Sequence, residues 1–207
     1  MLAAMPVMAA YTGHVYVDKN KNGVFDQSEK PLAGIKVSDG LNVVETAADG
    51  SFTLPGHERE RFIFITTPSG YKTFNRHYHK IEKKQSGYDF GLIPYSGRIR
   101  KDGSHRYIHI TDTEIFNTEN HADWVNNVRD YARNEQAAFI IHTGDICYEK
   151  GLKAHIKLMN TENMDCPVFY CIGNHDLVKG KYGEELFESI YGPVYYSFDA
   201  GNVYYIV

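Results

Sequence analysis

The sequence has few cysteines, little net charge and no long hydrophobic run. Its 207 residues include three cysteines, Cys147, Cys166 and Cys171, whose odd number and strand-like surroundings predict buried thiols and argue against a disulfide framework. A formal net charge of −4 gives no electrostatic basis for a nucleic-acid partner. No stretch is long and apolar enough for a transmembrane helix. The apolar share of 43% is nevertheless sufficient for one large or two small hydrophobic cores.

Residues 1–10 are apolar and rich in small side chains, as at the end of a signal peptide. Val7-Met8-Ala9 would suit cleavage, although no basic segment precedes it. We expect this stretch to be the remnant of a signal peptide and the protein to be exported. The alternative is a disordered leader or a short edge strand.

Residues 11–95 predict an all-β domain. Short hydrophobic runs occur at residues 14–17, 34–37, 42–45, 51–54 and 62–65, separated by turns such as Asp39-Gly40 and Asp49-Gly50. Strands of this length and spacing favour a small antiparallel sandwich. The polar residues 96–105 then predict a linker.

One loop in this domain matches the twelve-residue calcium pattern D-x-[DN]-x-[DN]-G-x5-E. Its predicted ligands are Asp18, Asn20, Asn22, the Val24 carbonyl, Asp26 and Glu29. The flanking residues are strand-like, so the loop is no EF-hand. We expect a structural Ca²⁺ here, the alternative being a polar turn that closes on itself through side-chain hydrogen bonds.

The loop and the segments that follow it, residues 31–37 and 49–52, resemble the B-type repeats of bacterial surface proteins. Those repeats are immunoglobulin-like or prealbumin-like sandwiches, some of which bind calcium. The resemblance covers about the first third of the chain. It implies an exported bacterial protein of the periplasm or cell surface.

From residue 106 the pattern changes to alternating strands and helices, which predicts an α/β domain over residues 106–207. Strands are expected at residues 107–111, 138–143 and 168–172, and helices at residues 120–134 and 152–160. Asn120 would cap the first helix, with Trp124, Val128 and Tyr131 along its buried face. A third helix around residues 186–190 and a hairpin over residues 194–207 follow.

Each of the three expected strands ends in polar residues that suit metal binding. These residues are Asp112, Glu114, Asp145, Asn174 and His175. In an open α/β sheet such residues meet at the carboxyl edge, and carboxylate, amide and imidazole groups favour Mn²⁺, Fe²⁺ or Zn²⁺, with Mg²⁺ also compatible. Two such ions can activate water and stabilise a phosphoryl group. We expect His142, His155 and His121 to be structural or surface residues, and His109 to be a core residue.

The three segments, Asp112-Thr113-Glu114, Gly144-Asp145-Ile146-Cys147 and Gly173-Asn174-His175-Asp176, resemble the D-x-H, G-D-x-x and G-N-H-[DE] blocks of calcineurin-like metallophosphoesterases. The resemblance implies the family's four-layer α/β domain with two divalent metals. Asp112 would bind the first metal, Asp145 would bridge, and Asn174 would bind the second. His175 would act as general acid or phosphate contact, supported by Asp176.

Two features depart from the family pattern. Glu114 stands where the family usually has histidine, which shifts the metal preference toward harder ions. The family's later ligands, a lone histidine and a G-H-x-H block, are expected after residue 207. We therefore expect residues 106–207 to form the first half of the domain, and the chain alone to be inactive or incomplete.

We expect a metal-dependent phosphoesterase that hydrolyses a phosphate mono- or diester with a metal-activated water. The alternative is a non-catalytic, calcium-binding surface, adhesion or carbohydrate-associated module on a decayed phosphoesterase scaffold. Glu114 and the missing later ligands favour this alternative, and the retention of Asp112, Asp145, Asn174 and His175 disfavours it. An incomplete sheet would also expose an edge through which the protein could associate.

Overall fold

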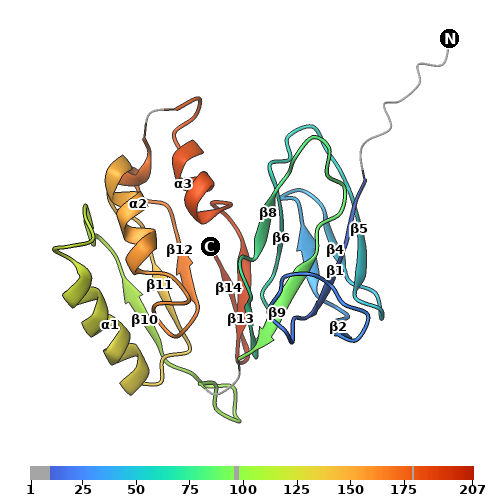
Figure 1. Cartoon of the computed structure of the whole chain (residues 1–207), viewed down its shortest axis with the longest axis horizontal. Coiled ribbons are helices and arrows are strands. Elements are labelled where there is room, and N and C mark those ends of the chain that lie inside the picture. Colours follow the sequence, from blue (N-terminus) through green and yellow to red (C-terminus); the bar gives the residue numbers. More distant parts are fainter. Residues whose placement is uncertain (1–9, 96–97, 179) are drawn as a thin grey trace. The chain divides into compact units, whose positions relative to one another are not determined.

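The computed structural model describes residues 10–95, 98–178 and 180–207. The predicted leader, apart from Ala10, and residues 96–97 of the predicted linker lie outside these ranges. The chain divides into two compact units (Figure 1), a first unit that ends at Pro94 and a second unit that begins at Tyr95. We describe each unit by itself.

The first unit consists of two β-sheets. Its strands are β1 (Ala10–Val17), β2 (Lys30–Pro31), β3 (Lys36–Ser38), β4 (Val43–Glu45), β5 (Ser51–Pro55), β6 (Phe62–Ile65), β7 (Tyr71–Thr73), β8 (Tyr78–Lys80) and β9 (Phe90–Pro94). One sheet has the order β2-β1-β9-β7, with β5 also paired to β1, and the other has the order β4-β3-β6-β8. Most pairs are antiparallel, but β1 and β9 run parallel, so the prediction of a wholly antiparallel arrangement is wrong at this pair.

Both sheets contribute to one hydrophobic core. Val15 of β1, Phe52 of β5 and Phe90 of β9 come from the larger sheet, while Val37 of β3 and Ile63 of β6 come from the smaller. Inward residues alternate with outward ones along β1 and β5, as expected for sheets with one buried face. Two sheets around a common core agree with the predicted sandwich. Its immunoglobulin-like or prealbumin-like assignment stays a prediction.

The second unit contains a parallel sheet, helices and a hairpin. Its elements are β10 (Tyr107–Ile110), α1 (Ala122–Asn134), β11 (Phe139–His142), α2 (Glu149–Leu158), β12 (Val168–Tyr170), the 3-10 helix η1 (Asn174–Asp176), α3 (Glu185–Tyr191), β13 (Ser197–Ala200) and β14 (Val203–Ile206). The sheet has the order β10-β11-β12, and both of its pairs are parallel. The antiparallel pair β13–β14 forms the expected hairpin.

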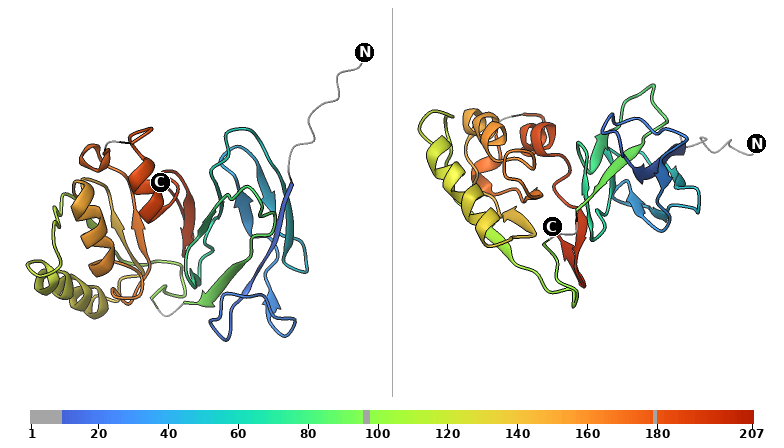
Figure 2. Two further views of the ribbon diagram at one scale, coloured as in Figure 1. Left: turned by 45° about the horizontal axis from the view of Figure 1, so that its top comes forward. Right: turned by 60° about the horizontal axis from the view of Figure 1, so that its bottom comes forward.

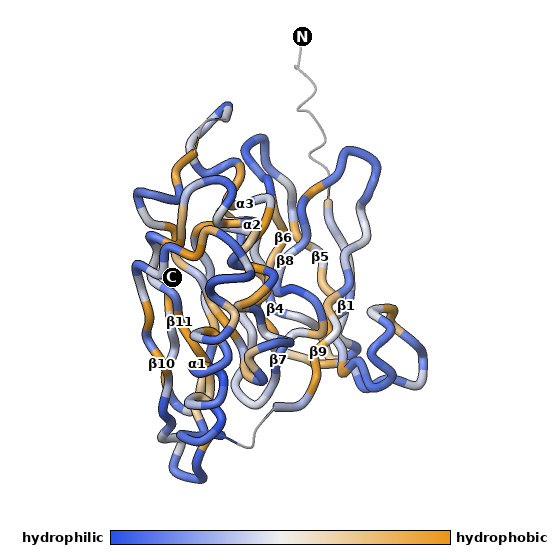
Figure 3. Tube along the Cα trace, turned by 60° about the vertical axis from the view of Figure 1, so that its left-hand side comes forward, coloured by the Kyte–Doolittle hydropathy of each residue, from blue (hydrophilic) through white to orange (hydrophobic). Residues whose placement is uncertain are grey.

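The two faces of the parallel sheet are covered differently. Ile140 and Val168 share one core with Val125 of α1 and with residues of α2. On the other face, Phe169 stacks on Phe198 of β13 with ring centroids 3.6 Å apart, and Phe139 packs edge-on against the same ring. The unit is therefore layered, with α1 and α2 on one side of the sheet and the hairpin on the other, as Figures 1 and 2 show from three directions. Strongly hydrophobic stretches occur in several strands, and most connecting loops are hydrophilic (Figure 3).

The helices exist as predicted, but their ends and faces differ. Helix α1 begins after His121, and Asn120 does not cap it; the Asn120 N–H donates to the Asn117 side chain instead. Val125 and Ala132 form the buried centre of its inner face, whereas Tyr131 is 60% exposed, contrary to prediction. Helix α2 begins three residues earlier than expected. The hydrophobic period therefore located each helix, but it misplaced the buried face of α1 by roughly one residue.

Candidate metal centre

Three loops leave the same edge of the parallel sheet. Asp112 and Glu114 follow β10, Asp145 follows β11, and η1 with Asn174 and His175 follows β12. Because all three strands run parallel and in register, their carboxyl ends lie at one edge. The residues predicted as metal ligands therefore all follow strands that end at this one edge of the sheet.

The backbone at this edge is strained at the carboxylates. Asp112, Glu114 and Asp145 have φ angles of 53°, 45° and 50°, in the left-handed region that residues with a Cβ seldom adopt. Each such residue costs on the order of 1–3 kcal/mol, and such residues cluster at functional sites. Thr111 holds the first of them, since its hydroxyl donates to Asp112 Oδ2 over 2.7 Å. The Asp112 N–H also donates to the Gly144 carbonyl over 3.2 Å.

The loops after β11 and β12 are in direct contact. The His175 N–H donates to Asp145 Oδ1 over 3.1 Å. A Cβ on Gly173 would lie 2.1 Å from the Asp145 nitrogen, so only glycine allows the loops to approach this closely. A Cβ on Gly144, whose φ is +92°, would in turn lie 2.6 Å from the Gly173 nitrogen. These contacts hold the Asp145 carboxylate next to the residues of η1.

Asp176 connects the same two loops from within. Its carboxylate is buried and accepts hydrogen bonds from the N–H groups of Ile146 (2.8 Å), Cys147 (3.1 Å) and Gly173 (2.9 Å). Burial raises the pKa of this carboxyl, against the lowering effect of the three N–H groups. Asp176 therefore positions the loops. Asp176 is predicted to support the His175 ring, but these hydrogen bonds go to backbone N–H groups and not to that ring.

The His175 ring lies half-exposed between an aromatic ring and a carboxylate. It stacks on Tyr148, with centroids 4.9 Å apart and an interplanar angle of 22°. Its Nδ1 lies 3.8 Å from Glu114 Oε1. The stacking limits how the ring can turn. An imidazole held in this way at a solvent-accessible edge can donate a proton to a bound substrate.

Two further histidines, His142 and His155, lie beneath the edge and are fully buried, which fits the structural alternative of the prediction and not the surface one. His142 Nε2 is 3.0 Å from the Thr113 hydroxyl, and His155 Nδ1 is 2.9 Å from the Tyr191 hydroxyl. Burial lowers the pKa of His142 to about 4 and that of His155 well below its usual value. The prediction for His109 is wrong: its side chain is exposed and bonds the Thr143 hydroxyl, because its position in β10 points away from the helices.

Contacts among the described residues bring together part of the predicted set of metal ligands. They join Asp145 and Glu114 through His175, and they join Asp112 to the loop after β11. Asn174 is exposed at the start of η1. Over residues 10–95, 98–178 and 180–207, however, the only set of three His, Cys, Asp or Glu ligand atoms lying within 4.8 Å of one another belongs to the first unit. The carboxylate, amide and imidazole groups at this edge nevertheless fit a borderline-hard divalent ion.

Sequence reasoning missed three residues that support this edge. Thr111 contacts the loop after β11, Thr113 contacts His142 of β11, and the Tyr148 ring stacks on the His175 ring. The two threonines flank Asp112, so a search for hydroxyls beside the acidic residues could have found them. Nothing in the spacing of Tyr148 indicated that it would stack on a histidine from a different loop.

The predicted calcium loop lies in the first unit between β1 and β2. Asp18 and Glu29 are almost fully buried, with 1% and 6% of their surface exposed. Asp18 accepts the N–H groups of Asn22 and Gly23, and Glu29 accepts those of Lys19 and Asp26. The side-chain amides of Asn20 and Asn22 both donate to Asp26 Oδ2. The loop is thus organised around its carboxylates, as a cation site or a self-closed polar turn would be.

Two family models match the chain. The model described as the N terminal of calcineurin-like phosphoesterase matches residues 19–94, and the calcineurin-like phosphoesterase model matches residues 105–206. A comparison with curated proteins finds no match. The chain belongs to the calcineurin-like phosphoesterases, a family of metal-dependent hydrolases that act on phosphate esters and use divalent metal ions.

The first match bears on the resemblance to bacterial surface repeats. It assigns the first unit to the N-terminal domain of calcineurin-like phosphoesterases, and the surface-repeat resemblance is not confirmed. Within the described residues, no helix has the length and apolar character needed to cross a membrane.

Proposed function

We propose that the second unit carries the metal centre of an enzyme that hydrolyses a phosphate mono- or diester. The observation that supports this most strongly is the contact of the Gly144-Asp145 and Gly173-Asn174-His175-Asp176 segments at one edge of a parallel sheet. Two of the three family blocks thereby share hydrogen bonds, and the third is joined to them through Asp112 and Gly144.

In this proposal Asp112, Glu114, Asp145 and Asn174 hold a pair of divalent ions, of which Mn²⁺, Fe²⁺ and Zn²⁺ suit the donors best and Mg²⁺ is compatible. Bound metal ions supply the Lewis acid that activates a water molecule and stabilises charge on the phosphoryl oxygens. His175 gives a proton to the leaving oxygen. Tyr148 keeps its ring in place by stacking, and Asp176 keeps the two loops together.

Two variants, made in a full-length version of the protein, separate the roles of ligand and acid. Asp145→Asn should remove metal occupancy and hydrolysis together, because the bridging ligand loses its charge. His175→Ala should leave the metal bound and lower turnover by at least about a hundredfold. Metal content by elemental analysis, with generic phosphodiester and phosphomonoester assays in added Mn²⁺, measures both. Equal metal loss in the two variants would contradict the assigned roles.

We also propose that residues 18–29 bind Ca²⁺ and that the protein is exported. Besides the buried Asp18 and Glu29, the proposal for calcium is supported by Tyr16, whose hydroxyl is fully buried and has no hydrogen-bond partner among the described residues. Burial and the adjacent charges of Asp18 and Glu29 raise the pKa of this hydroxyl. A cation here would neutralise the buried negative charge, which the loop's N–H groups only partly stabilise.

A further inference from the structure

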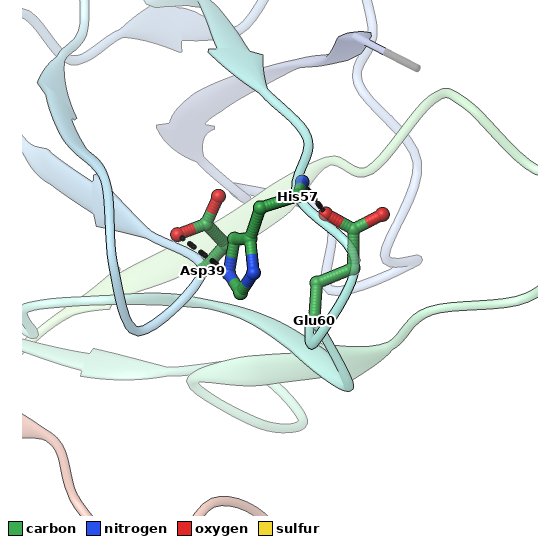
Figure 4. A group of neighbouring side chains, drawn as sticks. All are labelled: Asp39, His57 and Glu60. Carbon is green, nitrogen blue, oxygen red and sulfur yellow. Dashed lines mark hydrogen bonds and ion pairs between the residues drawn. The ribbon is translucent and has the colours of Figure 1, made fainter. Parts of the chain in front are cut away.

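A second group of potential metal ligands lies in the first unit, far in sequence from the family blocks. Asp39 follows β3, and His57 and Glu60 lie in the turn between β5 and β6. Each offers a ligand atom, and these atoms lie within 4.8 Å of one another (Figure 4). No spacing motif connects Asp39 to the other two residues, so the group becomes visible only in the folded chain.

The group is largely shielded from solvent. The Asp39 side chain is fully buried, and that of His57 is 16% exposed. His57 Nε2 is itself buried and lies 3.5 Å from Asp39 Oδ1, yet it makes no hydrogen bond with any described residue. Leaving a buried ring nitrogen without a partner costs on the order of 1–3 kcal/mol. A metal ion bound to this nitrogen, once its proton has moved to Nδ1, would remove that cost.

Both carboxylates are already held by hydrogen bonds, as the ligands of metal sites usually are. Asp39 Oδ1 accepts the N–H groups of Leu41 (2.9 Å) and Asn42 (2.7 Å), and Oδ2 accepts the Asn42 side chain (3.0 Å). Glu60 accepts the Tyr11 hydroxyl through one oxygen and the His57 N–H through the other. These partners orient the carboxylates and leave their remaining lone pairs for a cation.

The local field also favours a cation. The Asp39 and Glu60 carboxylates each offer an oxygen within 4.8 Å of the other ligand atoms of the group. Two carboxylates therefore act on one buried region, and a single imidazole can neutralise at most one of them. One nitrogen and two carboxylate oxygens suit Zn²⁺ and similar transition ions better than Ca²⁺ or Mg²⁺, which prefer oxygen ligands alone.

We propose that Asp39, His57 and Glu60 bind a divalent transition ion of the Zn²⁺ type, with water completing the coordination. The site joins the turn after β3, in the smaller sheet, to the segment that leads from β5, in the larger sheet, to β6. The Asn42 side chain already connects these turns by donating to the Pro55 carbonyl over 3.1 Å. A metal bound here would link the two sheets where the chain passes from β5 to β6.

Metal binding requires a change of tautomer at His57. Its Nδ1 accepts the Arg59 N–H over 3.2 Å, so a neutral ring carries its proton on Nε2. To bind metal through Nε2, the proton moves to Nδ1 and the Arg59 N–H turns to solvent, where Arg59 is exposed. The shift of the proton from one ring nitrogen to the other is a direct signature of the proposed site.

The test uses the whole chain, with metal binding blocked at the candidate centre of the second unit and at the loop over residues 18–29. Asp145→Asn removes the proposed bridging ligand of the second unit, and saturating Ca²⁺ occupies the loop over residues 18–29. Zn²⁺ is then titrated calorimetrically into this background and into the same background with His57→Gln or His14→Gln. His14 is the matched control, since its Nδ1 lies 3.4 Å from Asp89 Oδ1 at the surface, without a third ligand close enough among the described residues.

We expect His57→Gln to weaken Zn²⁺ binding at least about tenfold and His14→Gln to leave it unchanged. Equal Zn²⁺ affinity in all three proteins would overturn the proposal and leave Asp39 and His57 as an ordinary ion pair. Should His57→Gln fail to fold, ¹⁵N spectra of the histidine rings in the unsubstituted chain decide the question. Added Zn²⁺ must move the proton of His57 to Nδ1, and an unchanged His57 ring would refute the site.

Discussion

At the scale of single residues, the candidate metal centre combines charge with backbone strain. Asp112, Glu114 and Asp145 all have positive φ angles, although aspartate and glutamate carry a Cβ that disfavours this region. Local stability alone would favour glycine or asparagine at these positions. The acidic side chains are thus kept at a cost in stability, as is common where a side chain has a chemical role.

Glu114→Asn tests this opposition between stability and metal binding. Asparagine tolerates the left-handed conformation better than glutamate, and the Glu114 side chain is largely exposed. We expect the free energy of unfolding, measured with urea in the presence of a chelator, to rise by about 0.5–1 kcal/mol. Metal affinity should fall in the same variant. Glu119→Asn is the control, and a loss of stability in Glu114→Asn beyond that of the control would contradict the strain assigned to Glu114.

Gly173 tests the close approach of the two loops. A Cβ would lie 2.1 Å from the Asp145 nitrogen and 2.2 Å from Asp145 Oδ1, so Gly173→Ala must displace the proposed bridging carboxylate. We expect a loss of about 2–4 kcal/mol in unfolding free energy and a marked loss of metal affinity. Gly87→Ala, where a Cβ meets no atom within 4 Å, should change metal affinity little. Unchanged metal binding in Gly173→Ala would show that the loops can separate without consequence.

At the scale of elements, periodicity predicted the order of strands and helices in the second unit, and the polar residues after each strand predicted the edge of the sheet. The parallel pairing of β1 with β9 could not be predicted, because strand pairing across the whole first unit is set by tertiary packing. The inner face of α1 was displaced by about one residue for the same reason. Asp39 and His57 meet through two turns that show no shared motif, so their proximity needed the fold itself.

At this scale, we predict that the loop over residues 18–29 makes the stability of the first unit depend on Ca²⁺. We expect Ca²⁺ to raise the midpoint of thermal unfolding of the first unit by several degrees, since a ligand that binds only the folded state stabilises it. Glu29→Gln should abolish most of that rise, because the buried Glu29 is the bidentate ligand of the pattern. Glu45→Gln, at an exposed position of β4, is the control. A rise that persists in Glu29→Gln would favour the self-closed turn.

At the scale of the whole molecule, buried histidines connect stability to pH. Burial lowers the pKa of His142 in the second unit and of His77 in the first to about 4, and that of His155 further. Between pH 6.5 and about 4, each of these histidines is protonated in the unfolded chain and neutral in the folded one. The unfolded state then binds more protons, so stability falls as the pH is lowered through this window.

Both units should therefore lose stability on mild acidification, by up to about 3 kcal/mol per histidine at the lower end of the window. Asp176 acts in the opposite direction, because its raised pKa means that the folded state binds a proton more readily than the unfolded one. The three histidines outweigh this single carboxyl. Urea unfolding at pH 7.5, 6.5, 5.5 and 4.5 in the presence of a chelator measures the slope, and the ring shifts of His142 in NMR spectra identify its source. If stability stayed constant from pH 6.5 to 4.5, or if the His142 ring titrated near pH 6.5, the buried neutral state of these histidines would be refuted.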